Sequence, residues 1–566
     1  MKTKSINPLK SKEHLGLEKW PIAIQDKRRG ELVEEIIEET LSKYQAMDNE
    51  SLESVINKSI YLERQRLKAE PWKVDPPNEH VFWNKSKRKL EQALRIEDKQ
   101  EQKQKLLENI EKLIRRYTEE IVGNFNIETF FFARKFLTVF FKGLFDHFSF
   151  LDFFAQRRAR IRCLRHFHVK GDISKIKQLF KHGTVVILPT HSSNLDSILI
   201  GYMIDQVTKL PAFSYGAGLN LYNNSLAAFY MNRLGAYRVD RRKKNPIYLD
   251  TLKNMASISV EDGTNSIFFP GGTRSRDGIV ETRLKLGLLG SVIDAQRSSL
   301  EKGHNNKIFI VPLVVSYETV LEAGMLIEQH LKRSGREQYT SKIKRNCDFF
   351  KILKFARNLI FRKNDVFFSF GEPIDVIGNV VDHNGGSMDK YGNIIQVKSY
   401  FELNGKVNKD EQRESEYTKL LGKKIGEMFL RENILLPTNF LCYLVVNLLK
   451  ERHDTSEIFD ILRMPVKGWW VDRALLYENA QLLLQIFRQK EKEGIFHLSE
   501  HFKMTADKII EHALRFGGNY HVIKPMKEEQ RNNKLIINDL PVVIFYANRL
   551  DGYELEGQIK WLKEVS

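Results

Sequence analysis

The stretch that decides the fold is Val185-Val186-Ile187-Leu188-Pro189-Thr190-His191-Ser192-Ser193-Asn194-Leu195-Asp196. It opens on an apolar run of the kind found in buried strands, and a polar turn follows Pro189. The next residues, 198–204, are again apolar and continue as a helix would. This order of strand, loop and helix places His191 on the loop and Asp196 in the first helical turn.

His191 and Asp196 are the candidate catalytic residues of this stretch. On one continuous helix a spacing of five residues separates two side chains by about 140°, but at a loop-to-helix corner they can meet. The Asp196 carboxylate can then hold the Nδ1 proton, leaving Nε2 free to accept a proton. The alternative is a loop histidine that caps a helix. His147 and Asp152 share the spacing but lack a preceding strand, so we interpret them as structural.

Composition limits the class of protein. The chain has 566 residues, of which 42% are hydrophobic and 29% charged, so it is globular and long enough for several structural units. Its net charge of +18 favours an anionic partner, namely nucleic acid, an anionic membrane or a phosphorylated substrate. The three cysteines are too few and too scattered for a disulfide framework or a zinc site. No apolar core follows the N-terminal residues, so we expect no signal peptide and a cytoplasmic protein.

The first two regions of the chain differ sharply in composition. Residues 1–125 are charged with a helical spacing of apolar residues, which predicts a helical N-terminal region. Residues 126–166 are rich in phenylalanine and end in a run of arginines. Bulky aromatics beside cations are typical of a segment lying in a membrane interface. The alternative is a core helix with a solvated basic edge.

Residues 167–381 alternate between strand-like and helical patterns. Apolar runs at 185–188, 266–269, 308–315 and 366–370 predict strands, and helices are expected at 195–205, 246–258 and 284–296. This alternation predicts an α/β fold with a mainly parallel sheet flanked by helices. Residues 382–416 are polar and predict a linker, and residues 417–566 a mostly helical C-terminal region. Within it, residues 434–449 favour a buried helix over a membrane span, because polar residues interrupt them.

A second polar cluster follows the strand expected at 266–269. It reads Phe269-Pro270-Gly271-Gly272-Thr273-Arg274-Ser275-Arg276. The glycines let the backbone approach a ligand closely, and the two arginines offer planar forks suited to phosphate. This predicts an anion site, although a glycine-rich turn with solvated arginines has the same pattern. The run from Gly235 to Arg242 adds Arg238, Arg241 and Arg242, which fit a solvated face equally well.

Several other site types are missing from the sequence. It has no Walker A loop, and Gly216-Ala217-Gly218 lacks the third glycine of a dinucleotide turn. It has no Gly-x-Ser-x-Gly elbow, and its histidines show no metal-ligand spacing. We therefore expect no bound cofactor and no metal.

Four short blocks of this sequence occur in the same order as the conserved motifs of a known family. They are His191-Ser192-Ser193-Asn194-Leu195-Asp196, Gly216–Leu221 continuing to Arg233–Arg242, Phe269–Arg276, and Ile310–Glu318, with a weaker echo at Phe370–Ile374. Over about 200 residues the chain resembles the glycerolipid acyltransferase superfamily and its H-x-x-x-x-D motif. The branch it resembles most is that of the glycerol-3-phosphate and dihydroxyacetone-phosphate acyltransferases.

The resemblance implies transfer of a fatty acyl group from acyl-CoA or acyl carrier protein to a phosphorylated glycerol, in phospholipid biosynthesis. His191 and Asp196 would form the catalytic pair. Arg238, Gly271, Gly272, Thr273, Arg274, Ser275 and Arg276 would bind the acceptor, and Val311, Pro312 and Leu313 resemble the acyl-donor block. We expect a peripheral protein on the cytoplasmic face of the membrane that binds no nucleic acid.

One position departs from the family pattern. Members usually carry a glutamate where this chain has Gly271, and Asp277 or Glu281 is near enough in sequence to substitute. The departure leaves the exact acceptor open. Two alternatives therefore remain: an acyltransferase acting on lysophosphatidate, which would share every motif, and a non-catalytic basic protein that binds membranes or nucleic acid.

Overall fold

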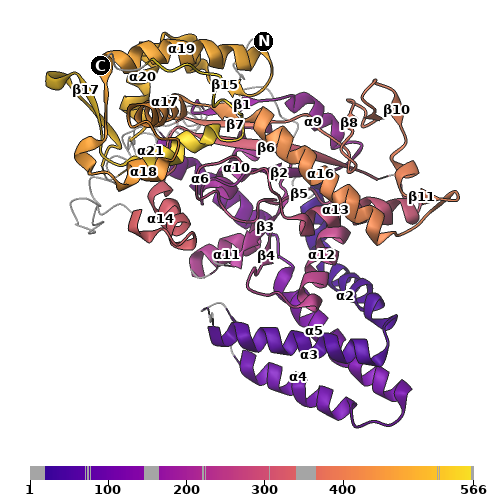
Figure 1. Ribbon diagram of the computed structural model, residues 1–566. Helices are drawn as coiled ribbons and strands as arrows, with labels where there is room; N and C mark the ends of the chain where they lie inside the picture. The colour runs from indigo at the N-terminus through magenta and orange to yellow at the C-terminus, as the bar shows by residue number, and fades with distance from the viewer. Residues whose placement is uncertain are drawn as a thin grey trace.

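A seven-stranded sheet forms the centre of the molecule (Figure 1). The computed structural model describes residues 19–562 apart from 70, 71, 73, 74, 77, 146–164, 220, 221, 223, 224, 305, 340–364, 519, 520 and 522. The strand order is β1-β7-β6-β2-β5-β3-β4. The strands are β1 (Phe167–Lys170), β2 (Gly183–Pro189), β3 (Ser214–Gly218), β4 (Ala236–Val239), β5 (Ser266–Ile267), β6 (Lys307–Tyr317) and β7 (Val366–Phe370).

The sheet is mainly parallel, which confirms the predicted fold class. Strands β6, β2, β5, β3 and β4 run parallel, whereas β7 is antiparallel to β6 and carries β1 beside it. The four predicted strands correspond to β2, β5, β6 and β7. Strands β1, β3 and β4 were not predicted, because their sequences FHVK, SYGAG and AYRV contain no continuous apolar run.

Helices cover both faces of the sheet. Val185 and Ile187 of β2 pack on one face with α9 (Ile173–Leu179) and α10 (Asp196–Met203). Val186 and Leu188 point to the other face, against α13 (Leu286–Glu301) and α16 (Glu411–Glu432). This alternation explains why β2 is apolar throughout, since a strand buried on both sides has no polar face. The predicted helices correspond to α10, α12 (Pro246–Glu261) and α13.

The N-terminal helices share a core with α12. Those in the shared core are α2 (Arg29–Gln45), α3 (Asn49–Ala69), α4 (Glu79–Ala93) and α5 (Lys99–Ile121). Helix α1 (Pro21–Lys27) packs in a separate cluster with Phe125. Figure 1 shows α3, α4 and α5 extending away from the sheet. Helix α6 (Ile127–Phe145) follows and begins the aromatic segment. The rest of that segment, with His147 and Asp152, lies outside the described residues.

Residues 382–416 form short paired strands where a linker was expected. Strands β8 (Val380–Val381), β9 (Ser387–Met388) and β10 (Ile394–Ile395) form one small sheet, and β11 (Glu402–Leu403) pairs with β12 (Lys406–Val407). Phe401 is fully buried among α13 and α16, and α16 already begins at Glu411. Phe401, with the partly buried Val397, Tyr400 and Val407, thus packs this polar stretch against the α/β domain.

The C-terminal region has a core of its own around α17 (Pro437–Arg452). That helix is buried over residues 437–449, which confirms the prediction of a buried helix. Around it lie α18 (Ile458–Arg463), α19 (Arg473–Lys492), α20 (Ala506–Phe516), α21 (Leu540–Ala547), the sheet of β14 (Trp470–Asp472), β16 (Met526–Glu529) and β17 (Lys534–Ile537), and the pair β13 (Ile434–Leu435) and β15 (His497–Leu498). Within the described ranges, every helix is too short or too polar to cross a bilayer.

The C-terminal region holds the loop that follows β5. Asn548 Nδ2 donates to the Asp277 carbonyl at 2.8 Å, and the Tyr546 hydroxyl accepts from the Val320 N–H at 2.9 Å. Gly278 adopts a φ of +88°, and a Cβ there would lie 1.8 Å from the Phe545 carbonyl oxygen. Only glycine permits both this backbone conformation and this close approach.

We therefore expect Gly278→Ala to destabilise the protein more than Gly263→Ala. Gly263 has a similar φ of +90° but no heavy atom within 4 Å of the added methyl group. Both variants add left-handed strain, and only Gly278→Ala also forces α21 away, at an additional cost of roughly 1–3 kcal/mol. Urea unfolding of both variants measures the difference, and equal losses would contradict this account.

Candidate active site

The candidate site lies where parallel strands end. His191 follows β2, the segment 269–281 follows β5, and Tyr317 closes β6; β5 and β6 are the two neighbours of β2. The carboxyl ends of parallel strands lie at one edge of a sheet, which is where α/β proteins bind ligands. The topology thus brings together residues that are more than 100 positions apart in the chain.

His191 and Asp196 are in direct contact. The distance from His191 Nδ1 to Asp196 Oδ2 is 2.8 Å, and the Asp196 side chain is fully buried. The same oxygen accepts the backbone N–H groups of Ser192 and Ser193, at 2.7 and 2.8 Å, while Oδ1 accepts the Tyr317 hydroxyl. Two backbone donors aimed at one carboxylate oxygen stabilise its charged form. Because a carboxylate only accepts, Nδ1 carries the proton and Nε2 is left as a base.

The His191 ring is held from a second side. It stacks on Phe269 with centroids 4.3 Å apart, and its side chain is 15% exposed. The His191 carbonyl accepts the Ser275 N–H at 2.7 Å. The loops after β2 and β5 are therefore fixed to each other next to the ring.

Glu322 is a site residue that the sequence did not reveal. It precedes α14 (Ala323–Arg333) and is buried. Its carboxylate accepts the Ser193 hydroxyl at 3.0 and 3.2 Å and the Asn194 N–H, and lies 3.7 Å from Arg274 Nη1. Glu322 therefore connects the His191 loop to an arginine of the glycine-rich loop. A glutamate in an amphipathic stretch gives no sequence signal for such a contact.

Four arginines crowd one side of the site. The pKa of Arg276 is lowered by burial and by the charges of Arg333, Arg274 and Arg241. The pKa of Arg241 is likewise lowered, by burial and then by Arg274, with Glu281 opposing. Burial is the largest cause of both shifts, and the neighbouring arginine charges add to it although Asp277 and Glu281 oppose them. The cluster is therefore suited to bind an anion.

The sequence left open whether Arg241 belongs to the site, and it predicted Arg238 as the arginine of this run that binds the acceptor. Arg238 donates from Nε to Asn232 Oδ1 at 3.1 Å and lies over the Tyr222 ring at 4.9 Å. Arg242 binds Asp240 and Asp75, so it links β4 to the N-terminal helices. The arginine pair of the second sequence block falls on Arg241 and Arg242, and that alignment was the signal for Arg241.

The rest of the glycine-rich loop has defined contacts. Gly272 has a φ of +72°, which turns the chain, and its N–H donates to the Phe269 carbonyl at 3.0 Å. Ser275 Oγ donates to Asp277 and to the Ile279 carbonyl. Thr273 Oγ1 accepts from Arg276 at 3.5 Å. These contacts keep the loop compact under the arginines.

Val311, Pro312 and Leu313 are buried in β6. They pair with Ile187, Leu188 and Pro189, and the Leu313 carbonyl accepts the Thr190 N–H at 2.9 Å. The structure therefore places them beneath the His191 loop, in the core of the sheet.

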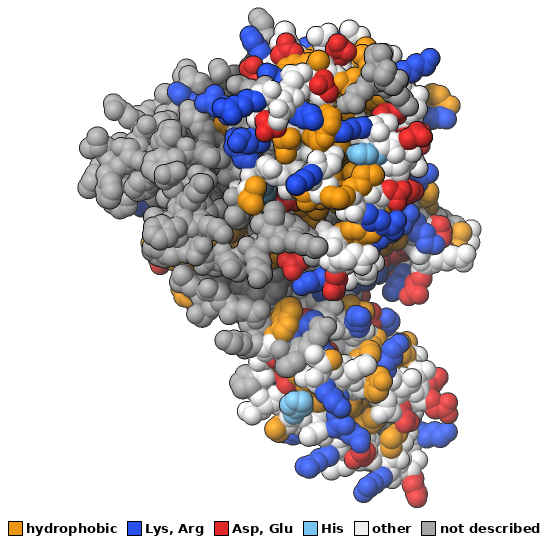
Figure 2. Space-filling model, turned by 60° about the vertical axis from the view of Figure 1, so that its left-hand side comes forward, with side chains coloured by type: hydrophobic (Ala, Val, Ile, Leu, Met, Phe, Trp, Pro, Cys, Tyr) orange, Lys and Arg blue, Asp and Glu red, His pale blue; other side chains and the backbone are white. Residues whose placement is uncertain are grey.

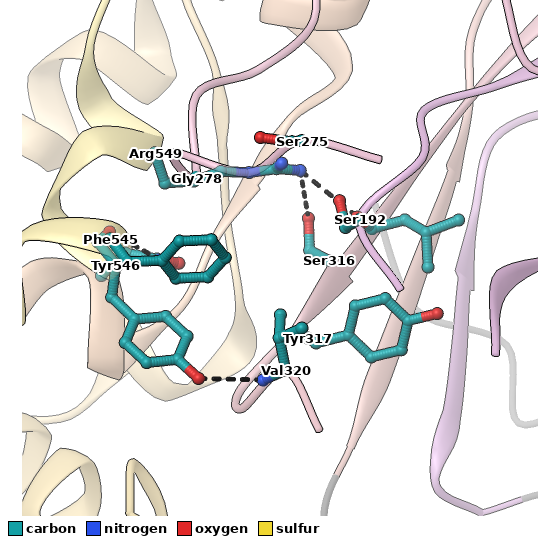
Figure 3. A pocket seen from close by; sticks show the side chains of 11 residues that line it. Ser192, Ser275, Gly278, Ser316, Tyr317, Val320, Phe545, Tyr546 and Arg549 are labelled. Carbon is teal, nitrogen blue, oxygen red and sulfur yellow. Dashed lines mark hydrogen bonds between the residues drawn. The ribbon is translucent and has the colours of Figure 1, made fainter. Parts of the chain in front are cut away.

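A small cavity adjoins the site (Figure 3). Ser192, Ser275, Gly278, Val315, Ser316, Tyr317, Val320, Asn439, Phe545, Tyr546 and Arg549 line it. The buried Arg549 donates to Asn433 at 2.8 Å and to Val315 and Ser316 at 3.3 Å, and burial lowers its pKa. The C-terminal region thus supplies one wall. In the described part of the chain, no group of His, Cys, Asp and Glu side chains could hold a metal ion.

Known proteins resemble this chain over the same region. Residues 170–316 match the family model described as Acyltransferase. The glycerol-3-phosphate acyltransferase of Aeromonas hydrophila is 25% identical over 327 residues, which cover 57% of this chain and 35% of the relative. Those of Haemophilus ducreyi and Ectopseudomonas mendocina are 27% and 26% identical over 37% and 49% of this chain. The matched segments span 24% and 30% of these two relatives, so the chain covers about a third or less of each.

The match contains the His191 loop, the glycine-rich loop and β6 up to Ser316, whereas Tyr317, Glu322 and Arg549 lie beyond it. Residues 170–316 are an acyltransferase domain. Through this domain the chain is similar to the glycerol-3-phosphate acyltransferases, which are members of the glycerolipid acyltransferase superfamily.

Proposed function

We propose that this protein transfers a fatty acyl group from an acyl thioester to a hydroxyl of glycerol 3-phosphate or a related phosphorylated glycerol. The observation that carries the proposal is the contact between His191 Nδ1 and the buried Asp196 carboxylate, next to the cluster of four arginines. The first feature supplies a base and the second binds a phosphate. The names of the relatives agree with both.

The reaction follows from this arrangement. His191 Nε2 takes the hydroxyl proton as the oxygen attacks the thioester carbonyl, and the Asp196 charge stabilises the imidazolium that forms. A C–O ester bond forms, the C–S bond breaks, and the proton passes to the departing thiolate. Holding the two reactants in position lowers the barrier by roughly 7–11 kcal/mol. Binding the phosphate away from the reacting hydroxyl provides that positioning.

Arginines 241, 274 and 276 are proposed to bind the phosphate, with Arg238 at a greater remove beside Tyr222. Figure 3 shows the small cavity that Ser275 and Gly278, on the chain after β5, help to line. Figure 2 shows one face of the molecule, on which Lys and Arg lie interspersed with acidic and apolar side chains. The site arginines instead crowd together, as the lowered pKa values of Arg241 and Arg276 indicate. Acyl-CoA and acyl carrier protein are the candidate donors, with Val311, Pro312 and Leu313 forming the base of the donor side. No bound cofactor is proposed.

Helix α6 is proposed to lie against the cytoplasmic face of a membrane. Phe131, Phe132 and Phe136 are 41%, 56% and 59% exposed, and Phe132 stacks on Tyr230 of α11 (Ser225–Arg233), with centroids 6.0 Å apart. Exposed aromatic rings are typical of helices that lie in a membrane interface. A peripheral location would place the site where its acylated product leaves.

We expect His191→Ala and Asp196→Asn each to lower kcat by about 10²–10⁴-fold, because each removes the oriented base. The assay offers purified protein a labelled acyl thioester with glycerol 3-phosphate, dihydroxyacetone phosphate or lysophosphatidate, and identifies the product. If the protein acylates lysophosphatidate but neither of the other two acceptors, it is a lysophosphatidate acyltransferase and the proposed acceptor is wrong.

The control for that experiment is His166→Ala. His166 Nδ1 also contacts a carboxylate, Asp365 Oδ1, at 2.7 Å, but it stands before β1 at the sheet's edge. It should leave kcat within about threefold of the parent. Full activity of folded His191→Ala would refute the mechanism and favour a non-catalytic binding protein.

Arg241→Ala and Arg274→Ala should each raise the KM for glycerol 3-phosphate by about tenfold or more, because each removes a charged hydrogen bond. Arg238→Ala should raise it less, since its guanidinium is held by Asn232 and Tyr222. The KM for the acyl donor should stay within twofold in all three. A larger effect for Arg238 than for Arg241 would reverse their assignment.

Phe131→Ser combined with Phe136→Ser should weaken binding to vesicles that contain anionic phospholipid by at least about tenfold, because each buried ring contributes roughly 1.5–3 kcal/mol. Co-sedimentation measures the binding. Leu420→Ser provides the control, since Leu420 is 61% exposed on α16 and outside this segment. Equal loss for both variants would argue against α6 as the contact.

A further inference from the structure

Gly271 and Glu281 occupy one space. A Cβ at Gly271 would lie 2.3 to 2.6 Å from the two carboxylate oxygens and Cδ of Glu281. Gly271 has no positive φ, so its backbone would accept a side chain. The obstacle at position 271 is therefore the Glu281 carboxyl group itself. Where relatives of the superfamily carry a glutamate, this chain has a glycine with a glutamate's carboxyl group against it.

The Glu281 carboxyl group is enclosed within the candidate site. Burial raises its pKa to about 8; the backbone of His191, which hydrogen-bonds to it, acts in the opposite direction, as does Arg549, while Asp196 adds to the rise. In its ionised form it also raises the pKa of Arg241. Glu281 therefore lies near both the His191–Asp196 pair and Arg241.

One Glu281 oxygen has no partner. Oε2 is buried and makes no hydrogen bond within the described structure. A buried polar atom without a partner costs about 1–3 kcal/mol, and a ligand group that hydrogen-bonds to it removes that cost. Asp277, the other candidate, already accepts the Ser275 hydroxyl at 3.1 Å and the Ile279 N–H at 3.2 Å. Its carboxylate stabilises the turn of the loop.

We propose that Glu281 replaces the missing family glutamate and binds a hydroxyl of the phosphorylated glycerol acceptor through its free oxygen. This inference rests on the proposed function. It makes Glu281 a substrate-binding residue whose carboxyl group reaches position 271 from ten residues further along the chain. The phosphate and the glycerol hydroxyl would then be held by different groups, the first by arginines and the second by Glu281.

The test moves the carboxyl group back to position 271. Glu281→Ala should raise the KM for glycerol 3-phosphate by about tenfold or more, with the donor KM within twofold. Glu281→Gln, which keeps an oxygen and the shape, should lose less. Gly271→Glu combined with Glu281→Ala should recover most of the loss, because the vacated space accepts the new side chain. Gly271→Ala combined with Glu281→Ala is the matched control and should recover nothing.

Calorimetric binding of glycerol 3-phosphate, measured on the same variants, separates this inference from the proposed function. If the parent protein is active but Glu281→Ala changes neither the KM for the acceptor nor acceptor binding, the inference about Glu281 is wrong and the proposed function stands. The same holds if the glutamate swap recovers no more than the alanine control, or if Glu281→Ala weakens donor and acceptor equally while lowering the Tm. An inactive parent that binds glycerol 3-phosphate through Glu281 would overturn the proposed reaction and leave the inference standing.

Discussion

The buried charge of Asp196 is the interaction on which the site depends. An isolated carboxylate costs several kcal/mol to bury, and here four donors compensate that cost: the His191 ring, two backbone N–H groups and the Tyr317 hydroxyl. The two backbone groups fold the loop after β2 around the carboxylate. Tyr317 attaches that loop to the end of β6. One side chain thus sets the ring orientation, the loop conformation and the position of a neighbouring strand.

Two further carboxyl groups extend this network. Glu322 connects the same loop to Arg274, and Glu281, which follows the glycine-rich loop in the chain, contacts the backbone of His191. Arg549 of the C-terminal region lies near enough to both Asp196 and Glu281 for each to raise its pKa against the effect of burial. The C-terminal helices are therefore part of the site, although the family match ends at residue 316. Their contact at Gly278 shows how closely the two regions are packed.

Local patterns in the sequence predicted the elements whose formation depends mainly on neighbouring residues. The apolar run before His191 and its five-residue spacing to Asp196 gave the strand, the loop and the candidate pair, and long apolar stretches gave β6, β7 and α17. Strands β3 and β4 were not predicted, because their sequences have no apolar run and only their pairing within the sheet makes them strands. Glu322 was not predicted as a site residue, because the residues that it contacts, Ser193 and Asn194, are 129 and 128 positions away in the chain. Arg238 lies in β4 and Arg241 just beyond its end, and which of them comes close to Arg274 depends on the assembled sheet, which no local spacing decides.

The arrangement of charge also explains why a glycine at position 271 is compatible with a phosphate site. A phosphate monoester is doubly charged near neutral pH, so an ionised carboxylate close to it would weaken its binding. With a pKa of about 8, the Glu281 carboxyl group is mostly neutral at pH 7, and it then both donates and accepts a hydrogen bond. In the proposed complex the arginines would keep their full attraction for the phosphate, while the neutral carboxyl group would still recognise a hydroxyl. Burial, which raises the pKa of Glu281 most, would thus let a carboxyl group and an anion share one small site.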